Sequence, residues 1–220
     1  MARRAVVGWI AVISGVALVA GLAVYMVRVG LGNIVGSGQA YLDKAAVSTL
    51  WSMHWAQRLF REGTYADRDG DGVGEFGTLG QLAAARPLPS GAPLPAPLLS
   101  LEGSPRVAGA GDALEASGTC FLGYLPDDAD GAERRFVVYA WPARQEGGGG
   151  KVFCIDQDED ILEADASVRG YFGCDRPPPR DACLGPEDAT GAPPTDGVKG
   201  DGAAWKRWKG KTSRKAIGAR

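Results

Sequence analysis

Carboxylates alternate along residues 67–75, whose sequence is DRDGDGVGE. Calcium takes six to eight oxygen ligands at about 2.3–2.6 Å, and a tight loop can turn alternate side chains toward one ion. Gly72 follows the third aspartate and permits the sharp turn that such a loop needs. The sequence therefore predicts a Ca²⁺ site with four carboxylates and one backbone carbonyl as ligands: Asp67, Asp69, Asp71, Glu75 and, through its carbonyl, Val73.

The predicted loop is not a standard EF-hand. The twelfth position, which carries a bidentate glutamate in an EF-hand, is Thr78. We therefore expect a structural ion with a dissociation constant of about 10⁻⁴–10⁻³ M, as in extracellular calcium modules. The alternative is a solvated acidic turn, because aspartate and glycine are ordinary turn residues. A second acidic run, residues 156–160, lacks the glycine and favours a charged turn.

No catalytic constellation accompanies this loop in the sequence. The one histidine, His54, has a spacing that favours a place on the flank of a helix rather than a catalytic role. No nucleophile with an adjacent base, and no paired carboxylates for acid–base work, stand out from the composition. A hydrolytic metal would also need an open coordination position beside a base. We therefore expect a protein that is not an enzyme.

The four cysteines are predicted to form disulfides. They make no CxxC pair and lie far from the histidine in sequence, which argues against zinc. Two of them fall in predicted strands, and two flank a proline-rich loop. We favour pairing within each set, while the other two connectivities and buried free thiols stay open. The favoured pairs are Cys120 with Cys154 and Cys174 with Cys183.

Residues 5–27 carry no charge and are long enough to cross a membrane. A bilayer core of about 30 Å needs about 20 helical residues, and the apolar part of a signal peptide is typically shorter. We expect a retained single-pass anchor, residues 1–28, with a cytoplasmic N-terminus because Arg3 and Arg4 precede the run. A cleaved signal peptide and a buried core helix are the alternatives. Small residues recur four apart, which lets membrane helices approach closely: Ala11 with Gly15, and Ala17 with Gly21.

The sequence that follows the anchor predicts a long amphipathic helix. A glycine-rich joint at residues 29–36 precedes the predicted helix over residues 37–62. Apolar side chains recur along it at intervals of three and four residues, so one face should pack on the rest of the domain. That face is formed by Val47, Leu50, Trp51, Trp55 and Leu59.

Beyond the acidic loop the sequence predicts a small antiparallel sheet, hence an α+β domain over residues 37–173. A short helix near residues 76–85 and a proline-rich surface loop come first. Three strand candidates follow and should form a meander packed against the long helix, over residues 119–125, 135–141 and 151–155. Residues 174–220 are expected to be an irregular segment with a disordered tail.

Charge divides the chain into an acidic domain and a basic tail. Residues 29–198 hold 13 Lys/Arg against 25 Asp/Glu, a net of −12, whereas residues 199–220 hold 8 basic residues against one aspartate, a net of +7. Such a tail suits anionic lipid headgroups or an anionic envelope polymer, and the predicted compartment argues against nucleic acid. A disordered solubilising tail is the alternative. Aromatic and basic side chains interleave at Trp205, Lys206, Arg207, Trp208, Lys209 and Lys211.

This order of elements resembles the architecture of type IV pilins and type II secretion pseudopilins. More narrowly, residues 65–77 (YADRDGDGVGEFG) followed by residues 134–142 (RRFVVYAWP) are similar to uncharacterised pilin-like proteins of planctomycetes and deltaproteobacteria. The resemblance covers about residues 40–173 and implies a pilin-like fold. Prepilins carry a Gly-Phe-type peptidase site before the apolar run and a glutamate at the fifth position after cleavage. This chain has neither feature, and Ile13 stands where the glutamate would fall.

The expected function is structural. We expect a membrane-anchored, pilin-like assembly protein of a bacterial inner membrane, with a calcium-stabilised periplasmic or extracellular domain. Through its N-terminal helix it would join a homo-oligomer, a filament at the cell surface or a secretion assembly. The alternative is a monomeric cell-envelope binding module whose basic tail holds an anionic lipid or polymer.

Overall fold

The computed structural model describes residues 38–100, 106–107, 113–145, 150–184, 197–198 and 200–210. The chain divides into two units, Met1–Tyr41 and Leu42–Arg220, and of the first only residues 38–41 are described. The predicted anchor, residues 1–28, and the joint, residues 29–36, therefore lie outside the described part. Among the described residues, no helix combines the length and the apolar character needed to cross a membrane.

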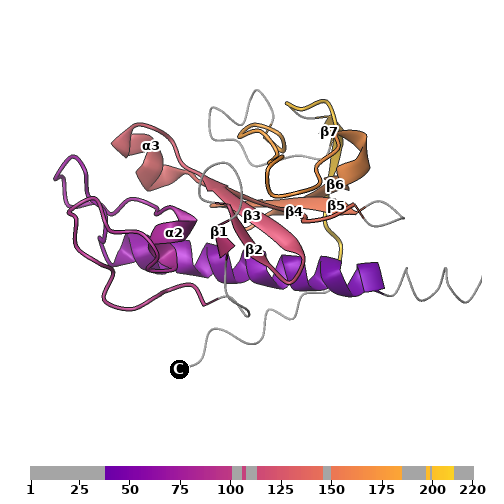
Figure 1. The fold of residues 1–220 in the computed structure, drawn as a ribbon. Helices are drawn as coiled ribbons and strands as arrows, with labels where there is room; N and C mark the ends of the chain where they lie inside the picture. Colours follow the sequence, from indigo (N-terminus) through magenta and orange to yellow (C-terminus); the bar gives the residue numbers. More distant parts are fainter. Residues whose placement is uncertain are drawn as a thin grey trace, which may run out of the picture. The chain divides into compact units, whose positions relative to one another are not determined.

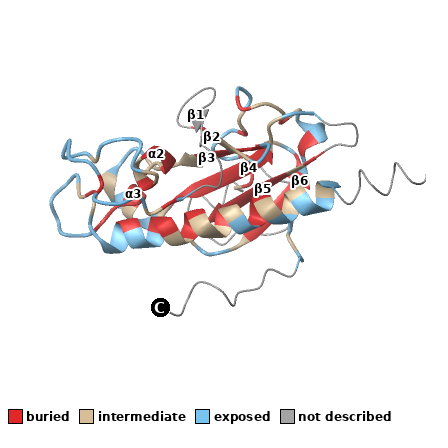
Figure 2. Ribbon diagram, turned by 60° about the horizontal axis from the view of Figure 1, so that its bottom comes forward, coloured by how far each residue is buried: buried red, intermediate tan, exposed pale blue. Residues whose placement is uncertain are grey.

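A long helix over residues 38–62 lies along one face of an antiparallel sheet (Figure 1). Its predicted existence is confirmed, but the predicted buried face is right only in its first half. Val47 and Leu50 are fully buried, whereas Leu59 is 51% exposed and Phe60 packs inward in its place. Figure 2 shows the buried face as a red stripe that recurs along the helix. The residues that form the stripe are Ala46, Val47, Leu50, Met53, His54, Ala56, Gln57 and Phe60.

Two buried polar residues explain why hydropathy predicts only part of the buried face of the long helix. His54 and Gln57 are each 1% exposed, so the buried face continues through residues that hydropathy places outside. The prediction that His54 lies on the flank of the helix is therefore wrong. Positions 50, 53, 54, 57 and 60 follow the three-and-four spacing of one helix face once these polar residues are included.

The sheet is a regular antiparallel array. In the described residues eight strands follow the order β1-β2-β3-β4-β5-β6-β8-β7. Six of them form its body, and β1 (Arg106–Val107) and β7 (Gly197–Val198) add two residues each at the edges. The predicted meander is confirmed as β3, β4 and β5. The six main strands are β2 (Leu114–Ala116), β3 (Thr119–Tyr124), β4 (Val137–Pro142), β5 (Lys151–Asp156), β6 (Ile161–Asp165) and β8 (Ala204–Arg207).

Both faces of the sheet are covered, because side chains alternate along each strand and both sets are buried. One face packs against the long helix through residues such as Phe121, Val138 and Phe153. The other face carries residues such as Tyr139 and Trp141. It is covered by residues 170–184, here called the strap, which contain neither helix nor strand, and Trp205 of β8 belongs to the same apolar cluster. Double coverage explains why the strands appear in the sequence as continuous apolar runs.

Short helices complete the unit. The predicted helix near residues 76–85 is present as the shorter α2 (Leu79–Leu82), which begins with a capping box between Thr78 and Gln81. A further helix, α3 (Ala129–Arg134), was not predicted and is capped by the Asp128 side chain. A 3₁₀ turn, η1 (Ala166–Val168), follows β6.

The disulfides pair differently from the favoured prediction. Cys120 on β3 bonds to Cys174 of the strap, and Cys154 on β5 bonds to Cys183, with Cα–Cα distances of 5.4 and 6.6 Å. Strands β3 and β5 lie on either side of β4, so Cys120 and Cys154 are about 10 Å apart across two strand spacings. That separation exceeds the reach of a disulfide. The predicted pairs, Cys120 with Cys154 and Cys174 with Cys183, are therefore wrong. Each disulfide instead joins the strap to a strand of the sheet.

The C-terminal residues also depart from the prediction. Strands β7 and β8 fall within residues 174–220, which were expected to be irregular. Strand β8 pairs with β6, with Glu163 opposite Lys206. The expectation of disorder is wrong for these strands, because Trp205 is 1% exposed and anchors β8 in the strap-side core.

Candidate metal centre

The acidic loop is folded by its own aspartates. Both carboxylate oxygens of Asp67 accept backbone hydrogen bonds, from the N–H groups of Gly70 at 2.8 Å and Gly72 at 3.1 Å. The Asp71 carboxylate accepts the N–H of Val73 at 2.7 Å. Gly70 and Gly72 have φ values of 76° and 86°, a left-handed conformation that glycine adopts without strain. Local side-chain chemistry thus bends residues 67–73 into a series of tight turns.

The segment after these turns is fixed against the long helix and α3. The Gln57 amide donates to the carbonyl of Gly77 at 2.7 Å and accepts its N–H at 2.9 Å. A Cβ at Gly74 would overlap the carbonyl oxygen of Arg61, so the close approach to the helix end requires glycine. On the other side, the N–H of Phe76 donates to the carbonyl of Ala132 at 2.9 Å. The loop is therefore held between the helix end and α3.

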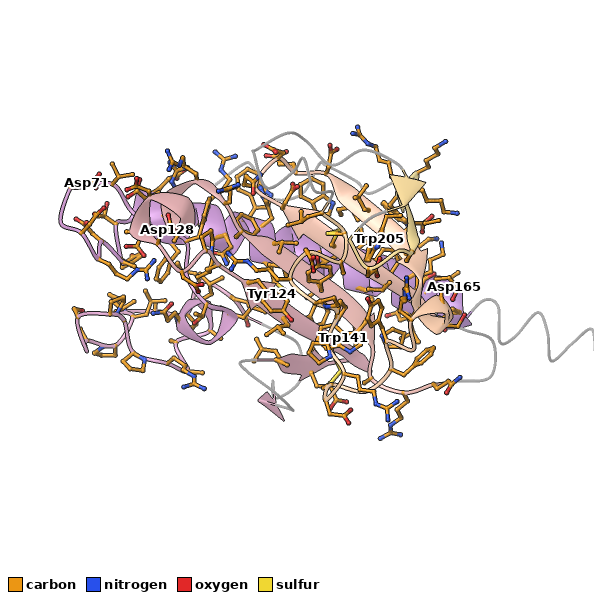
Figure 3. The ribbon with its side chains drawn as sticks, turned by 90° about the horizontal axis from the view of Figure 1, so that it is seen from above. Asp71, Tyr124, Asp128, Trp141, Asp165 and Trp205 are labelled. Atoms are coloured by element: carbon orange, nitrogen blue, oxygen red, sulfur yellow. A yellow bond between two sulfur atoms is a disulfide. The ribbon has the colours of Figure 1, made fainter. Side chains whose placement is uncertain are left out.

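This placement brings carboxylates together in two groups that could hold a cation. Within each group, one oxygen from every member lies within 4.8 Å of the others. Asp69 belongs to both groups, and α3 supplies the remaining members of the second. Figure 3 shows the loop and α3, marked by Asp71 and Asp128, at the same end of the sheet. The groups are Asp67, Asp69 and Asp71, and Asp69, Asp130 and Glu133.

Sequence reasoning missed the contribution of α3. Asp130 and Glu133 are three positions apart and so share one face of a helix. That spacing was visible, but nothing local indicates that this face turns toward a loop far away in the sequence. The contact depends on tertiary hydrogen bonds such as that between Phe76 and Ala132.

Glu133 is the member of the second group with the most unusual environment. Its Oε1 atom is buried and has no hydrogen-bond partner among the described residues. Burial raises the pKa of the Glu133 carboxyl, and the carboxylates of Asp71, Asp69 and Asp130 raise it further. A cation at this point would relieve that repulsion, since opposite charges within a few ångströms favour the ionised carboxylate.

Glu75 takes a different position from the predicted one. It is 3% exposed and belongs to neither carboxylate group. One oxygen accepts the backbone N–H of Arg68 at 2.7 Å, and the other accepts its guanidinium Nε at 2.5 Å. The same guanidinium donates to the carbonyl of Asp127 at 3.2 Å. Glu75 thus closes the loop through Arg68, while the role of the Val73 carbonyl as a ligand stays a prediction.

The ligand set consists of oxygen donors alone. Carboxylates and backbone carbonyls are ligands for hard cations such as Ca²⁺ and Mg²⁺, and Ca²⁺ tolerates the less regular geometry. Asp69, Asp71 and Asp130 are exposed, so a bound ion would retain water ligands. An open, solvent-facing group of this kind fits weak structural binding.

The aromatic and basic residues of the tail are largely part of the fold. Trp205 is buried and donates its indole N–H to Asp201 at 3.1 Å. Lys206 lies 3.6 Å from the Glu163 carboxylate, and Arg207 donates to Asp160 at 2.8 Å. Trp208 packs, partly buried, against the helix-side core, and Lys209 is exposed. Lys211 lies outside the described residues.

The fold as a whole is compatible with a pilin-like architecture, since a long helix packs on a six-stranded antiparallel sheet. Two disulfides indicate an extracytoplasmic domain, because oxidising compartments are where such bonds persist. Comparison of the chain with protein-family models, curated proteins and solved structures gives no match.

Proposed function

We propose that this chain is a membrane-anchored, pilin-like assembly subunit with a calcium-stabilised domain outside the cytoplasm. Residues 5–27 anchor it, and the apolar segment brings copies together in the membrane. The unit Leu42–Arg220 forms the exported part. The acidic loop holds a structural Ca²⁺ ion that fixes the junction between the long helix and α3.

One observation carries this proposal. In the sequence a 23-residue uncharged run precedes the long helix, with ten residues between them, and the helix packs on a disulfide-bonded antiparallel sheet. A membrane segment joined by a short linker to a rigid domain brings the domains of associating copies close together. That combination suits a subunit whose copies associate through their helices.

The alternative, an envelope-binding module that grips an anionic polymer with its basic tail, loses part of its support. Lys206 and Arg207 lie beside Glu163 and Asp160, so these carboxylates compete with an anionic ligand for the two basic side chains. Trp205 is buried and cannot stack on a ligand. The proposed assembly role does not require the basic tail, so we prefer it to the envelope-binding role.

Assembly is tested by enlarging the small residues of the anchor. Gly15→Leu and Gly21→Leu should reduce the association of copies, because leucine prevents close approach of helices. The measurement is the size of the full-length protein after mild detergent extraction, together with its recovery in a sheared surface fraction. Ala20→Leu is the matched control, since on an ideal helix it lies about 140° from Gly15 and about 100° from Gly21.

A loss of association in the two glycine variants but not in the control supports the proposal. Retained disulfides and an unchanged proteolysis pattern of the exported unit would show that folding is intact. Association that is equal in all variants, or a wild-type protein that is monomeric throughout, would contradict an assembly role.

A further inference from the structure

The outward side of the long helix carries a row of uncharged residues, here called the outer row. A surface helix that buries one face usually presents charged and polar side chains on the other. In this helix a series of outward positions recurs at intervals of three and four residues, and none of them is charged. All are exposed or half-exposed, and Figure 2 shows such pale blue and tan segments along the helix between the red ones. The outer row consists of Ala45, Ser48, Ser52, Trp55 and Leu59.

The side chains of the outer row suit contact with another helix. Leu59 is 51% exposed, and Trp55 is half-buried with the guanidinium carbon of Arg58 4.9 Å from its ring centroid. Ser52 donates its hydroxyl to the carbonyl of Ser48 at 3.2 Å, so this polar group is satisfied within the helix. Small side chains in the first half of the row let a second helix approach closely, and the larger ones at its end supply apolar area.

The spacing of the outer row indicates what kind of surface fits it. Alternating steps of three and four residues average 3.5 residues per turn, which is the repeat along which two helices pack in a left-handed coiled coil. In a parallel pair of identical helices, a residue on one side of the row meets the residue five positions later in the other copy. Lys44 then faces Thr49, and Trp51 faces Ala56, so no like charges meet at these flanking positions.

The outer row ends where the last turn of the helix becomes charged. Glu62 occupies the next position of the spacing, and in a symmetric pair it would face the same glutamate of the other copy. Arg58 lies 3.5 Å from Glu62 and 3.6 Å from Glu159, and these exposed ion pairs offset only part of such a repulsion. The contact surface therefore extends over residues 45–59, which is about 21 Å of helix.

The length of chain before the helix determines which partner reaches the outer row. The uncharged run ends at residue 27 and the helix begins at residue 38, so ten residues lie between them. Ten residues span at most about 35 Å. Copies that associate through the uncharged run in one membrane therefore hold their long helices near each other, in the same direction and at the same level. The partner that this arrangement supplies is a second copy of the chain.

The outer row is too small to hold two copies together by itself. A strip about 21 Å long and about 10 Å wide offers on the order of 200 Å² per copy. Stable complexes bury about 800 Å² per partner. When the anchors already hold two copies together, a weak contact is sufficient, because the effective concentration of the second helix is then about millimolar. The area of the outer row thus suits a contact that depends on the membrane segment.

We propose that the outer row of the long helix packs against the same row of a second copy, with the two helices parallel and in register. This contact rests on the proposed function, because it requires copies that are held in one membrane. It adds a specific surface outside the membrane to the association of the anchors. Because the sheet packs on the opposite side of each helix, the two domains point away from each other and leave the acidic loops accessible.

The test is cross-linking of the full-length protein in isolated membranes with a short bismaleimide. All four native cysteines are in disulfides, so Ser48→Cys provides a single reactive thiol. In an in-register pair this residue meets its own copy, and a covalent dimer should form. Ser90→Cys is the matched control, because Ser90 is also an exposed serine but lies in the proline-rich loop, and it should give little dimer.

A charge on the outer row should separate the helices. With Ser48→Cys as the reporter, Leu59→Lys brings two lysines together across the pair and should reduce the yield of covalent dimer about fivefold or more. Val168→Lys is the matched control, because Val168 is also an exposed apolar residue, at 60%, and lies on η1 outside the long helix. It should leave the yield unchanged. Retained native disulfides in each variant would show that folding is intact.

Three results would overturn this pairing and leave the proposed assembly role standing. The first is a Ser48→Cys protein that associates in detergent yet gives no more covalent dimer than Ser90→Cys. The second is a dimer yield that Leu59→Lys lowers no more than Val168→Lys does. The third is a dimer that forms only when Ser48→Cys and Leu59→Cys copies are mixed, which would show a staggered contact. A wild-type protein that is monomeric throughout would instead contradict the proposed function, and the pairing with it.

Discussion

Asp69 is the residue at which the two carboxylate groups of the acidic loop meet. Its neighbours Asp67 and Asp71 are occupied with backbone hydrogen bonds of the loop, whereas Glu133 has an oxygen without a partner among the described residues. A cation bound through Asp69 would connect the loop to α3. The fixed part of the site is thus the backbone, and a bound ion would add a further link to the hydrogen bond between Phe76 and Ala132.

Removal of calcium should therefore destabilise the wild-type chain. With 10 mM Ca²⁺ and a dissociation constant of 10⁻⁴–10⁻³ M, the free energy of unfolding should rise by about 1.4–2.7 kcal/mol over that in chelator. Asp69→Ala should abolish this difference. The measurement is thermal unfolding of the full-length protein in both solutions.

Further variants distinguish the two carboxylate groups. Glu133→Gln should reduce the calcium effect if the ion is shared with α3, and it should leave the effect unchanged if the loop aspartates bind alone. Asp127→Asn is the matched control, because this exposed acid belongs to neither group. Equal melting temperatures of the wild type with calcium and with chelator would favour a bare acidic turn.

For single residues, the sequence predicts part of the candidate metal centre. The alternation of Asp67, Asp69 and Asp71 predicts a shared group, because loop chemistry is local. Glu133 is not predictable in the same way, since its proximity depends on how α3 packs. Glu75 fits the ligand pattern equally well, yet Arg68 competes for its carboxylate and holds it in the interior.

The long helix owes its position on the sheet partly to a buried amide. Gln57 makes two hydrogen bonds with the backbone of Gly77, which is itself buried. These bonds fix the rotation of the helix and the path of the chain that leaves the acidic loop. An apolar residue of the same size would fill the space and satisfy neither backbone group.

Gln57→Met should therefore destabilise the domain strongly. Two buried backbone groups lose their partners, and the free energy of unfolding should fall by about 2–4 kcal/mol. Chemical denaturation of the full-length chain measures the change. Leu59→Met, two residues further along on the exposed face, should alter stability by less than about 0.5 kcal/mol. Similar losses in both variants would argue against a specific role of the amide.

Elements were predictable where periodicity is strong. The long helix and strands β3 to β5 follow from it, whereas β6 does not, because its apolar run is short and adjoins acidic residues. The residues of β8 were predicted to belong to a basic tail for a different reason. Alternation of Trp205 and Lys206 fits both a half-buried strand and a basic aromatic tail, and pairing with β6 decides between them.

Across the whole molecule the two faces of the sheet are covered by different means. The long helix covers one face with apolar side chains, whereas the strap covers the other without regular structure. Aromatic side chains of the sheet hold the strap by its backbone: the Tyr139 hydroxyl donates to Arg180, Tyr124 donates to Pro178, and the Trp141 indole donates to Gly173. Two disulfides add to these bonds.

Reduction of the disulfides should therefore loosen the strap on one face of the sheet and leave the long helix in place on the other. In the double variant Cys120→Ala/Cys174→Ala the loss of one cross-link should lower stability by about 4 kcal/mol according to loop entropy. Hydrogen exchange should increase first in residues 170–184, while amides 46–60 keep their protection. Reductant should produce the same order in the wild type. A simultaneous loss of protection across the whole unit would contradict this view.

The connectivity of the disulfides also constrains how the protein matures during export. A chain that enters an oxidising compartment from its N-terminal side presents Cys120 and Cys154 before either strap cysteine. A bond between these two is incompatible with the finished sheet, because β4 runs between them. If such a bond forms early, thiol–disulfide exchange has to break it before the sheet can close. To that extent the yield of mature protein would depend on the capacity of the compartment to rearrange disulfides as well as to form them.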